Sequence, residues 1–590
     1  MKRISPYEYL EIVSKVAANP SFHTDNWRAT SSGIEIYFDG FDIDGIIDIP
    51  RNKSVHFVNC KLKHVKLDDG KIDSLVFENT KVIDIEISSS QLVNLQFNRT
   101  SQIDNVTIAD SISIGNITIH AKTVLGSLEI SGNSTIGTIH VDHSTINDFR
   151  FYESACTGLY FNKSSVNQNI ELTQSADIKS FMFQDSFLKR ELNIVSSQLG
   201  NFSLTGSQIG DINVLGSSLN SFIITSSKNG WIGLRDSTIT SIKLITSSAT
   251  GINVTYLRKD SKRMIIEKSL IAALIITLEN SFEMMINDST IWSLSFSKKI
   301  FPKDAILRLS DCKCNQMIFS SFTNQGAIYF NNITALEEGD NYKTNDNLVQ
   351  IDAEGKYIFE TTKRDSEIKI LNSDLGKTSF IGCNLNNFSR FVFLNSRLLD
   401  VFIADTLLPK KERILTTENK ISGYEKLEQT RLALSQFKKI YENRGDVVMA
   451  IEYHAQEMET YRQCLKFAKP KSRTERWDIR GERVNLWLNR TSSYYGNNWL
   501  KAIIITLGLN WFLFTLYCLF LGYRPGTDYQ KFGELFSYSW EFLNPIRKIN
   551  VMSENVTSVS RIIDYLSRIV IAYCVYQTIQ AFRKFGKKSV

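Results

Sequence analysis

The spacing of apolar residues between Ile72 and Leu244 is the feature that most constrains what this chain can fold into. A unit of apolar, two residues, apolar, one residue, apolar recurs every ten or eleven residues, and Ser, Thr, Asn and Gly fill the gaps. The alternating apolar positions are typical of a short strand, and the small polar residues are typical of tight turns. Such units begin at Ile72, Val82, Leu92, Ile103, Ile114, Leu125, Ile136, Ile146, Ile178, Leu199, Ile209, Leu219 and Ile239.

Strands this short cannot bury a face alone, so we expect them to stack as the coils of a β-solenoid. Two units, about twenty-one residues, would make one coil. A β-sandwich is the alternative, but sandwich strands do not keep so constant a period. Apolar residues also recur nearly every five positions, as at Ile72, Phe77 and Val82, often with Ser or Thr two positions earlier. The pattern predicts a mainly β protein with a solenoid over residues 51–408.

Residues 1–50 are predicted to form an N-terminal cap. Ser5 can cap a short helix, Pro6 suits its first turn, and an Asn-Pro pair would stop it near residue 20. The repeat weakens over residues 256–278, where the run RKDSKR is expected to be an exposed insertion. It breaks again in the polar stretch EEGDNYKTNDN before its last units.

After Pro409 the apolar period changes from that of a strand to that of a helix. One helix is expected to run from Gly423 to Glu442, and Asp446 would cap a second that ends near residue 467. Residues 409–470 are therefore predicted to form an antiparallel helical hairpin, which is suited to packing against copies of itself.

The C-terminal residues 499–590 hold the most apolar segments of the chain. Ala502 to Leu521 carry no charge, and about twenty apolar residues cross roughly 30 Å of hydrocarbon as a helix. A second segment includes Asp564 and Arg568, which lie four residues apart and can neutralise each other on one helical face. We predict two transmembrane helices, at about 500–522 and 562–582. A buried core helix and an interfacial helix are the respective alternatives.

One stripe of the second predicted span is polar. At about 100° per residue, Tyr573, Gln577, Gln580 and Lys584 fall on one side of the helix. An unsatisfied amide in lipid is costly, so this stripe must face protein or water. Because two spans enclose little space, we expect copies of the stripe to line a pore in a homo-oligomer, such as a tetramer. The alternative is that the glutamines only hydrogen-bond neighbouring helices.

A basic juxtamembrane linker is predicted over residues 471–498. Lys and Arg are concentrated there and in the tail after the second span, so the positive-inside rule places both flanks in the cytoplasm. The connection 522–561 then lies on the far side, where its segment FGELFSYSWEFLNPIRK is either a surface helix or a re-entrant pore element. The basic block is expected to bind an anionic ligand or anionic lipid headgroups through Lys471, Arg473, Arg476, Arg480 and Arg483.

Other features of the sequence argue against several classes of protein. The first twenty residues lack the apolar core of a signal peptide, and the scattered cysteines suit a reducing compartment. No phosphate loop, catalytic triad order or dinucleotide turn occurs. His140 and His143 would lie on opposite faces of a strand, and Cys312 and Cys314 have no second pair. We therefore expect no metal, no cofactor and no enzymatic activity.

The C-terminal part of the chain resembles a known kind of protein. The runs LSQFKKIYENRGDVVMAIEYHAQEM and YQTIQAFRKFG, with the pair Asn544-Pro545, are similar to bacterial membrane proteins that join pentapeptide-like solenoids to a two-helix, channel-like tail. The resemblance covers residues 424–590 well and the solenoid only in style, because the usual Ala-Asp/Asn-Leu consensus is absent. Some proteins of this build are channel effectors in antiphage operons. The chain also resembles, more distantly, the effector of Hailong-type systems, whose channel is held shut by short single-stranded DNA.

The resemblance implies a ligand-gated ion channel of the bacterial inner membrane, multi-pass, with both termini in the cytoplasm. It implies an antiphage, abortive-infection effector that depolarises the membrane under control of a nucleotide or a single-stranded DNA oligomer. A partner nucleotidyltransferase would make that oligomer, and the basic block would bind it together with solenoid residues Arg258, Lys259, Lys262 and Arg263. The alternative is a membrane-anchored solenoid scaffold without a pore.

Overall fold

The structure, a computed structural model, divides the chain into two compact units. The first comprises Met1–Arg390 with Ala404–Leu408, and the second comprises Phe391–Ile403 with Pro409–Val590. The residues that the structure describes are 2–18, 21–24, 27–31, 35–50, 54–111, 113–174, 176–297, 300–336, 350–351, 357–358, 366–398, 400–410, 413–415, 423–468, 472–521, 537–547 and 557–586.

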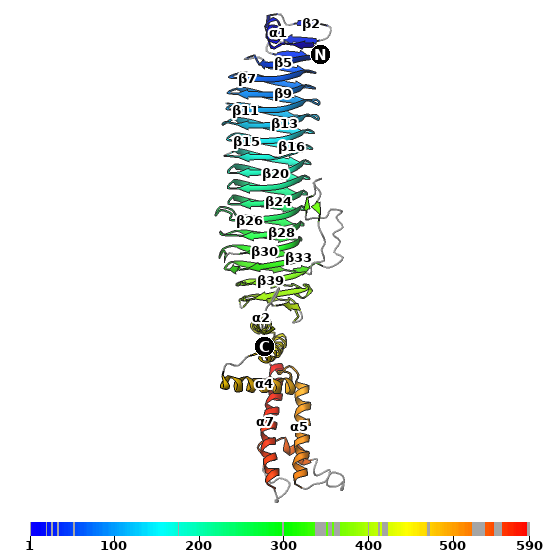
Figure 1. The fold of residues 1–590 in the computed structure, drawn as a ribbon, viewed down its shortest axis with the longest axis vertical. Coiled ribbons are helices and arrows are strands. Elements are labelled where there is room, and N and C mark those ends of the chain that lie inside the picture. The colour runs from blue at the N-terminus through cyan, green and yellow to red at the C-terminus, as the bar shows by residue number, and fades with distance from the viewer. Residues whose placement is uncertain are drawn as a thin grey trace. The chain divides into compact units, whose positions relative to one another are not determined.

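The first unit is a β-solenoid, so the predicted fold class, mainly β with C-terminal helices, is confirmed (Figure 1). Strands pair in parallel with the equivalent strand of the next coil, and Gln91 pairs with Lys71 on one side and Ser113 on the other. The steps of 20 and 22 residues correspond to two predicted units for each coil. The break predicted at EEGDNYKTNDN lies outside the described residues.

Two long sheets form the walls of the solenoid. One contains β1 (Lys2–Ile4), β5 (Phe41–Asp48), β7 (Lys61–Asp68), β9 (Lys81–Ser88), β11 (Gln102–Ala109), β13 (Val124–Ser131), β15 (Thr145–Tyr152), β17 (Ser165–Val166), β18 (Ile170–Thr173), β20 (Phe187–Val195), β22 (Gln208–Leu215), β24 (Lys228–Arg235), β26 (Ser248–Thr255), β28 (Leu270–Thr277), β30 (Thr290–Ser297), β33 (Lys313–Ser320), β36 (Thr334–Ala335) and β39 (Glu367–Leu371). The other contains β2 (Ser21–Thr24), β3 (Trp27–Ser31), β4 (Glu35–Asp39), β6 (Ser54–Val58), β8 (Lys71–Glu78), β10 (Gln91–Asn98), β12 (Ser113–Ile119), β14 (Thr135–Asp142), β16 (Ala155–Asn162), β19 (Asp177–Gln184), β21 (Gln198–Thr205), β23 (Ser218–Thr225), β25 (Thr238–Ile245), β27 (Arg263–Glu267), β29 (Glu283–Asn287), β32 (Ile306–Ser310), β35 (Ala327–Asn331) and β40 (Thr378–Ile381). Two small sheets pair β31 (Ile300–Phe301) with β34 (Thr323–Asn324) and β37 (Gln350–Ile351) with β38 (Tyr357–Ile358).

Each regular strand bends as it crosses a corner of the coil. In β9 the second, fifth and seventh residues, Val82, Ile85 and Ile87, are all buried. Residues three apart in a straight strand point to opposite faces, so a bend must separate the second residue from the fifth. The bend explains why apolar residues recur at spacings of three and two, which gives the five-residue period seen in the sequence. The core is completed by ring stacks, such as Phe202 against Phe181 at 5.0 Å and Phe222 at 4.7 Å between centroids.

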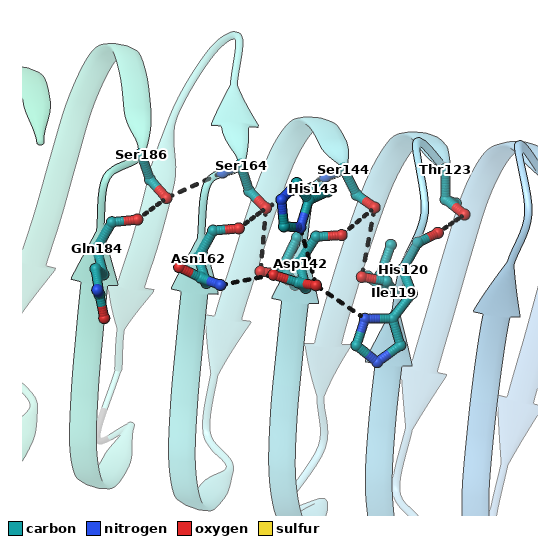
Figure 2. A network of polar contacts seen from close by, with 11 residues as sticks. Ile119, His120, Thr123, Asp142, His143, Ser144, Asn162, Ser164, Gln184 and Ser186 are labelled. Atoms are coloured by element: carbon teal, nitrogen blue, oxygen red, sulfur yellow. Dashed lines mark hydrogen bonds and ion pairs between the residues drawn. The ribbon is translucent and has the colours of Figure 1, made fainter.

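A buried hydroxyl closes one corner of many coils, and we call this set the serine ladder. Ser164 is typical: its Oγ donates to the Asn162 carbonyl at 2.8 Å, and its backbone N–H donates to Ser186 Oγ at 3.0 Å (Figure 2). The residue before it, Lys163, has a left-handed backbone with φ of 47°. The ladder thus satisfies the corner amides that the sheets leave unpaired. Its members are Thr80, Ser101, Thr123, Ser144, Ser164, Ser186, Ser207, Ser227, Ser247, Ser269 and Ser289.

The N-terminal cap contains the predicted helix, α1 (Pro6–Ala18), directly after β1. The Glu8 backbone N–H donates to Ser5 Oγ at 3.2 Å, and the Ser5 N–H donates to Glu8 Oε2 at 2.7 Å. This reciprocal pair is a capping box. The hydrogen bond from the Ser5 backbone lowers the pKa of Glu8 below its ordinary value.

The second unit begins where β41 (Arg390–Leu394), β42 (Phe402–Ala404) and β43 (Ile414–Leu415) end the strands. The predicted hairpin follows as α2 (Gly423–Arg444) and α3 (Val447–Phe467), and Asp446 caps α3 by accepting from the Met449 N–H at 3.2 Å. Next come α4 (Arg473–Ser493), α5 (Trp499–Phe520) and α7 (Ser558–Gly586). α4 lies within the segment that the sequence predicts as a basic linker. Ser472 caps this helix by accepting from the Glu475 N–H at 3.1 Å.

Candidate functional site in the helical unit

α5 and α7 are long and apolar enough to cross a membrane, which confirms the two apolar helices that the sequence predicts. They pack side by side and antiparallel (Figure 1). Trp499 meets Phe582 at one end, with 5.1 Å between ring centroids, and Thr557 donates to the Phe520 carbonyl at the other. The buried residues of α5 recur at intervals of three and four, as expected of one helix face. They are small or polar in the first half of the helix and larger towards its end: Ala502, Thr506, Asn510, Phe514, Tyr517 and Cys518.

The predicted pore-lining stripe begins in a polar cluster with α4, which we call the glutamine cluster. Gln577 is buried; its Nε2 donates to Asn489 Oδ1 at 2.7 Å, and its Oε1 accepts from Ser493 Oγ at 3.1 Å. The Tyr573 hydroxyl donates to the same Asn489 oxygen at 3.1 Å. Within one chain, Tyr573 and Gln577 thus hydrogen-bond a neighbouring helix, which is the alternative that the sequence left open. A pore-lining role for them stays a prediction.

The rest of the predicted stripe lies nearer the end of α7. Gln580 is partly exposed, and Lys584 belongs to α7 by its backbone, but its side chain is outside the described part of the structure. The structure therefore brings Tyr573 and Gln577 together at α4 and leaves Gln580 available to water, lipid or another copy.

A charged cluster lies at the opposite end of the α5 and α7 pair, and we call it the arginine cluster. Arg547, from the connection between the helices, donates to Asp564 Oδ1 from Nη2 at 2.7 Å and from Nε at 3.1 Å. Arg568 Nε donates to the other Asp564 oxygen at 2.8 Å, as the four-residue spacing predicts. The Arg547 and Asp564 side chains are only 5% and 2% exposed. Buried charge of this kind is tolerated only when it is paired and hydrogen-bonded, as it is here.

Residues 537–547 of the connection pack against the middle of α5. Asn510, eleven residues from the start of α5 and ten from its end, donates from Nδ2 to the Ser539 carbonyl at 2.9 Å. Phe542 lies against Phe514 and Tyr517, with ring centroids 5.4 and 5.5 Å apart. A helix rises about 1.5 Å per residue, so Ser539 lies about 15 Å from either end of α5.

The predicted ligand-binding block forms the first half of α4. Arg473, Arg476 and Arg480 are exposed, whereas Arg483 is partly buried and its Nε donates to the Leu465 carbonyl of α3 at 3.1 Å. Lys471 lies outside the described residues. The solenoid residues Arg258, Lys259 and Lys262, between β26 and β27, and Arg263, the first residue of β27, are all exposed and belong to the other unit.

One side of α4 packs against α3, and the opposite side, which we call the bare side, is exposed. Ile479 and Leu486 pack into a cluster with α3. At about 100° per residue, Trp477 and Val484 lie nearly opposite them, and both are more than half exposed, at 64% and 57%. α4 also runs across the ends of α5 and α7 (Figure 1). Its bare side therefore combines arginines with exposed aromatic and aliphatic groups, the composition of a helix at a membrane interface.

Carboxylate contacts fix the end of α4 near the candidate spans. Glu459 of α3 accepts from Arg462 Nη2 at 2.7 Å and from the Tyr495 hydroxyl at 3.1 Å. Burial opposes ionisation of Glu459, but the hydrogen bond and charge of Arg462 hold its pKa below the ordinary value. The Tyr461 hydroxyl similarly donates to Glu482 of α4 at 2.6 Å. These contacts tie the hairpin to the helix that leads into α5.

No protein-family model, curated protein or solved structure matches this chain. Among the described residues, no group of three or more His, Cys, Asp or Glu is placed to hold a metal ion. The eight cysteines are free and buried. The candidate site is therefore defined by its own geometry, which consists of the glutamine cluster, the arginine cluster, residues 537–547 and the exposed face of α4.

Sequence reasoning missed the partners in both clusters. Asn489 and Ser493 lie in the segment predicted as a basic linker, Arg547 lies in the aromatic connection, and none of the three was predicted to have a partner. One usable signal was present: Arg547 lies in an aromatic segment of the connection, three residues after Asn544 of an Asn-Pro pair. An Arg that is buried in such a segment needs an acidic partner, and Asp564 was the acidic residue already assigned to the second span.

Proposed function

We propose that this chain is the subunit of a homo-oligomeric ion channel in a bacterial inner membrane, with α5 and α7 as its transmembrane helices. One observation supports the proposal most directly: charged and amide side chains of α5, α7 and residues 537–547 are buried, between these elements at one end of the helix pair and against α4 at the other. Such groups are costly in hydrocarbon, and a helix that only anchors a protein has no use for them. The positive-inside rule, applied to α4 and the C-terminal tail, places both termini in the cytoplasm.

In this proposal the solenoid senses a ligand, and the hairpin of α2 and α3 assembles the subunits or transmits the signal. The resemblance to pentapeptide-like membrane proteins and to Hailong-type effectors suggests an antiphage role, in which opening depolarises the membrane and stops growth. The controlling ligand is then anionic, a nucleotide or a single-stranded DNA oligomer from a partner nucleotidyltransferase. Arg473, Arg476 and Arg480 are exposed and available to bind it.

The direct test is the membrane potential of a bacterial host that expresses the full chain, recorded with a voltage-sensitive dye. A version that ends before Trp499 is the control. Depolarisation by the full chain alone supports the channel. If the host shows none, the purified full chain is tested for ion flux in liposomes with and without a short single-stranded DNA. Absence of flux in every condition would reject the channel.

A second candidate function is the membrane-anchored scaffold, and one observation favours it. Tyr573 and Gln577 already have hydrogen-bond partners within one chain, so they do not require a pore. Replacing Gln577 and Gln580 together by Leu separates the two candidates. On the channel proposal, conductance is lost while the protein stays in the membrane, and Gln580→Leu alone, which spares the contact with Asn489, reduces it. Unchanged conductance in both variants would remove this stripe from the pore.

Ligand binding has its own test. A fluorescent single-stranded DNA should bind the full chain with an affinity that falls as salt rises. Arg473→Ala, Arg476→Ala and Arg480→Ala together should weaken binding and flatten the salt dependence, whereas Arg444→Ala, on an exposed end of α2, should not. Binding that is indifferent to all four changes would exclude α4 as the DNA site.

A further inference from the structure

Residues 537–547 contact α5 far from its end, whereas a connection that lies on the membrane surface would contact only the end of the helix. Ser539 contacts Asn510 at the midpoint of α5, and Phe542 contacts Phe514, which is six residues from the end of that helix. Glu541 lies between these two contacts, so its backbone is about 9–15 Å in from the end of α5. The hydrocarbon core is about 30 Å thick, and a 22-residue α5 spans it with little to spare. If α5 crosses the membrane, Glu541 is therefore inside the hydrocarbon layer.

Arg547 fixes the segment at this depth. Besides its bonds to Asp564, it donates from Nη1 to the Phe542 carbonyl at 2.6 Å and from Nη2 to Ser567 Oγ at 2.5 Å. Its guanidinium lies over the Phe542 ring, 3.5 Å from the centroid. The end of the segment is thus bonded both to itself and to α7. Its placement follows from contacts with both candidate spans.

The two charged residues of the segment have different surroundings. Arg547 is buried and neutralised by Asp564, whereas Glu541 is exposed. Among the described residues, the Glu541 carboxylate has no hydrogen bond or ion pair. A carboxylate facing lipid at this depth would be strongly unfavourable, so it must face water or ions.

A second polar atom at the same level also lacks a partner. Asn510 is buried, and its Oδ1 accepts no hydrogen bond from the described residues although its Nδ2 is bonded to Ser539. Buried acceptors are normally satisfied by protein or by water. An unpaired amide oxygen and an unpaired carboxylate near the middle of one helix pair are both accounted for by water that reaches this depth.

We propose that residues 537–547 form a re-entrant element, and that Glu541 faces an aqueous ion pathway and makes it selective for cations. Two helices and a short segment cannot enclose such a pathway, so its other walls come from further copies of the chain. A ring of carboxylates raises the local concentration of cations and excludes anions. The proposal rests on the channel function proposed above, and it names the ion class and the residue that selects it.

The electrical test measures reversal potentials of the purified full chain in planar bilayers under a potassium chloride gradient. The unsubstituted chain should prefer potassium over chloride, Glu541→Gln should lose most of that preference, and Glu541→Lys should reverse it. Glu442→Gln, which removes an exposed carboxylate at the end of α2, is the matched control and should behave as the unsubstituted chain. Current whose cation preference survives Glu541→Gln would overturn the proposal.

A chemical test works even if no current is seen. Glu541→Cys and Phe512→Cys place thiols at similar depth on full chains in vesicles, one at the proposed pathway and one on the exposed apolar face of α5. A charged, membrane-impermeant methanethiosulfonate reacts with thiolates, which form only in water. We expect residue 541 to react about tenfold faster than residue 512, with labelling of the buried native cysteines subtracted. Equal protection at both positions would overturn the re-entrant assignment.

The two tests also separate the proposals from each other. Rapid labelling at residue 541 without ion flux under any condition would reject the channel but support a water-filled re-entrant site. Ion flux with no labelling and unchanged selectivity in Glu541→Gln would support the channel and reject Glu541 as its selective residue.

Discussion

The solenoid and the helical unit both bury polar groups, but they do so in opposite ways. In the solenoid one uncharged contact recurs in coil after coil, so that Ser164 and Ser207 have equivalent surroundings. In the helical unit each polar cluster occurs once, and one of them contains two arginines and a carboxylate. A repeated contact maintains register along a stack of equivalent coils. A unique, charged cluster between two apolar helices has no such role and is the better guide to function.

The largest effect should come from breaking the arginine cluster. Arg547→Met would leave Asp564 buried with only Arg568 beside it, and loss of a buried ion-pair partner costs about 3–5 kcal/mol. Thermal unfolding of the full chain in detergent, followed by the reactivity of the buried thiols of Cys518 and Cys574, measures it. Arg561→Met, at an exposed position of α7, is the control. Equal shifts in the two variants would contradict a special role for the cluster.

A single change in the serine ladder should cost less. Ser207→Ala removes the acceptor of the Ser186 N–H and leaves that buried amide unsatisfied, at about 1–3 kcal/mol. The loss should be local, because each coil contacts only its neighbours. Amide hydrogen exchange should therefore quicken near residues 183–227 and not elsewhere. Ser218→Ala, at an exposed strand end, should leave exchange unchanged. Uniform destabilisation of the whole solenoid would show that the ladder acts cooperatively over many coils.

A smaller free-energy change is expected for the exposed face of α4, which should bind lipid. A fluorescent probe on Val484→Cys should be quenched by lipids that carry a spin label near the headgroup. Trp477→Ala should reduce that quenching, because burial of half of an exposed Trp contributes about 1–2 kcal/mol. A probe on Asp478→Cys, which lies about 100° around the helix from Trp477, should be quenched less. Equal quenching at residues 478 and 484 would contradict an interfacial α4.

The smallest effect should come from Asp142, a partly exposed carboxylate on the solenoid. Asp142 lies 3.0 Å from His143 Nδ1 and 3.6 Å from His120 Nδ1 (Figure 2). Burial opposes its ionisation, but hydrogen bonds from His143 and Asn162 hold the pKa of Asp142 below its ordinary value. The stabilisation is therefore present at neutral pH and is lost as pH falls below about 4. Asp142→Asn should change stability by less than about 0.5 kcal/mol at pH 7. A loss above that, measured by hydrogen exchange, would assign the histidines a larger role.

Sequence reasoning succeeded where a local rule repeats. The five-residue spacing predicted the buried positions of the solenoid, and Asp446 correctly marked the start of the second helix of the hairpin. It also predicted the pairing of Asp564 with Arg568, since residues four apart meet on a helix.

It failed where contacts join distant segments. Nothing in the period of α7 shows that Gln577 bonds to Asn489, which lies 88 positions earlier. The aromatic segment around Phe542 has no clear period, so its depth against α5 became visible only through its contacts with Asn510 and Phe514. The sequence analysis predicted a linker in place of α4, because Ile479 and Leu486 form only a weak apolar stripe among many arginines.

The serine ladder also has a consequence for how such a gene can change over evolution. Between Ser207 and Ser247, removal of twenty residues, from one ladder position to the next, deletes one complete coil and brings equivalent neighbours together. Removal of ten would bring the chain to the wrong sheet. The length of this solenoid can therefore grow or shrink only in whole steps, so in-frame duplications and deletions of one coil should survive where shorter ones do not.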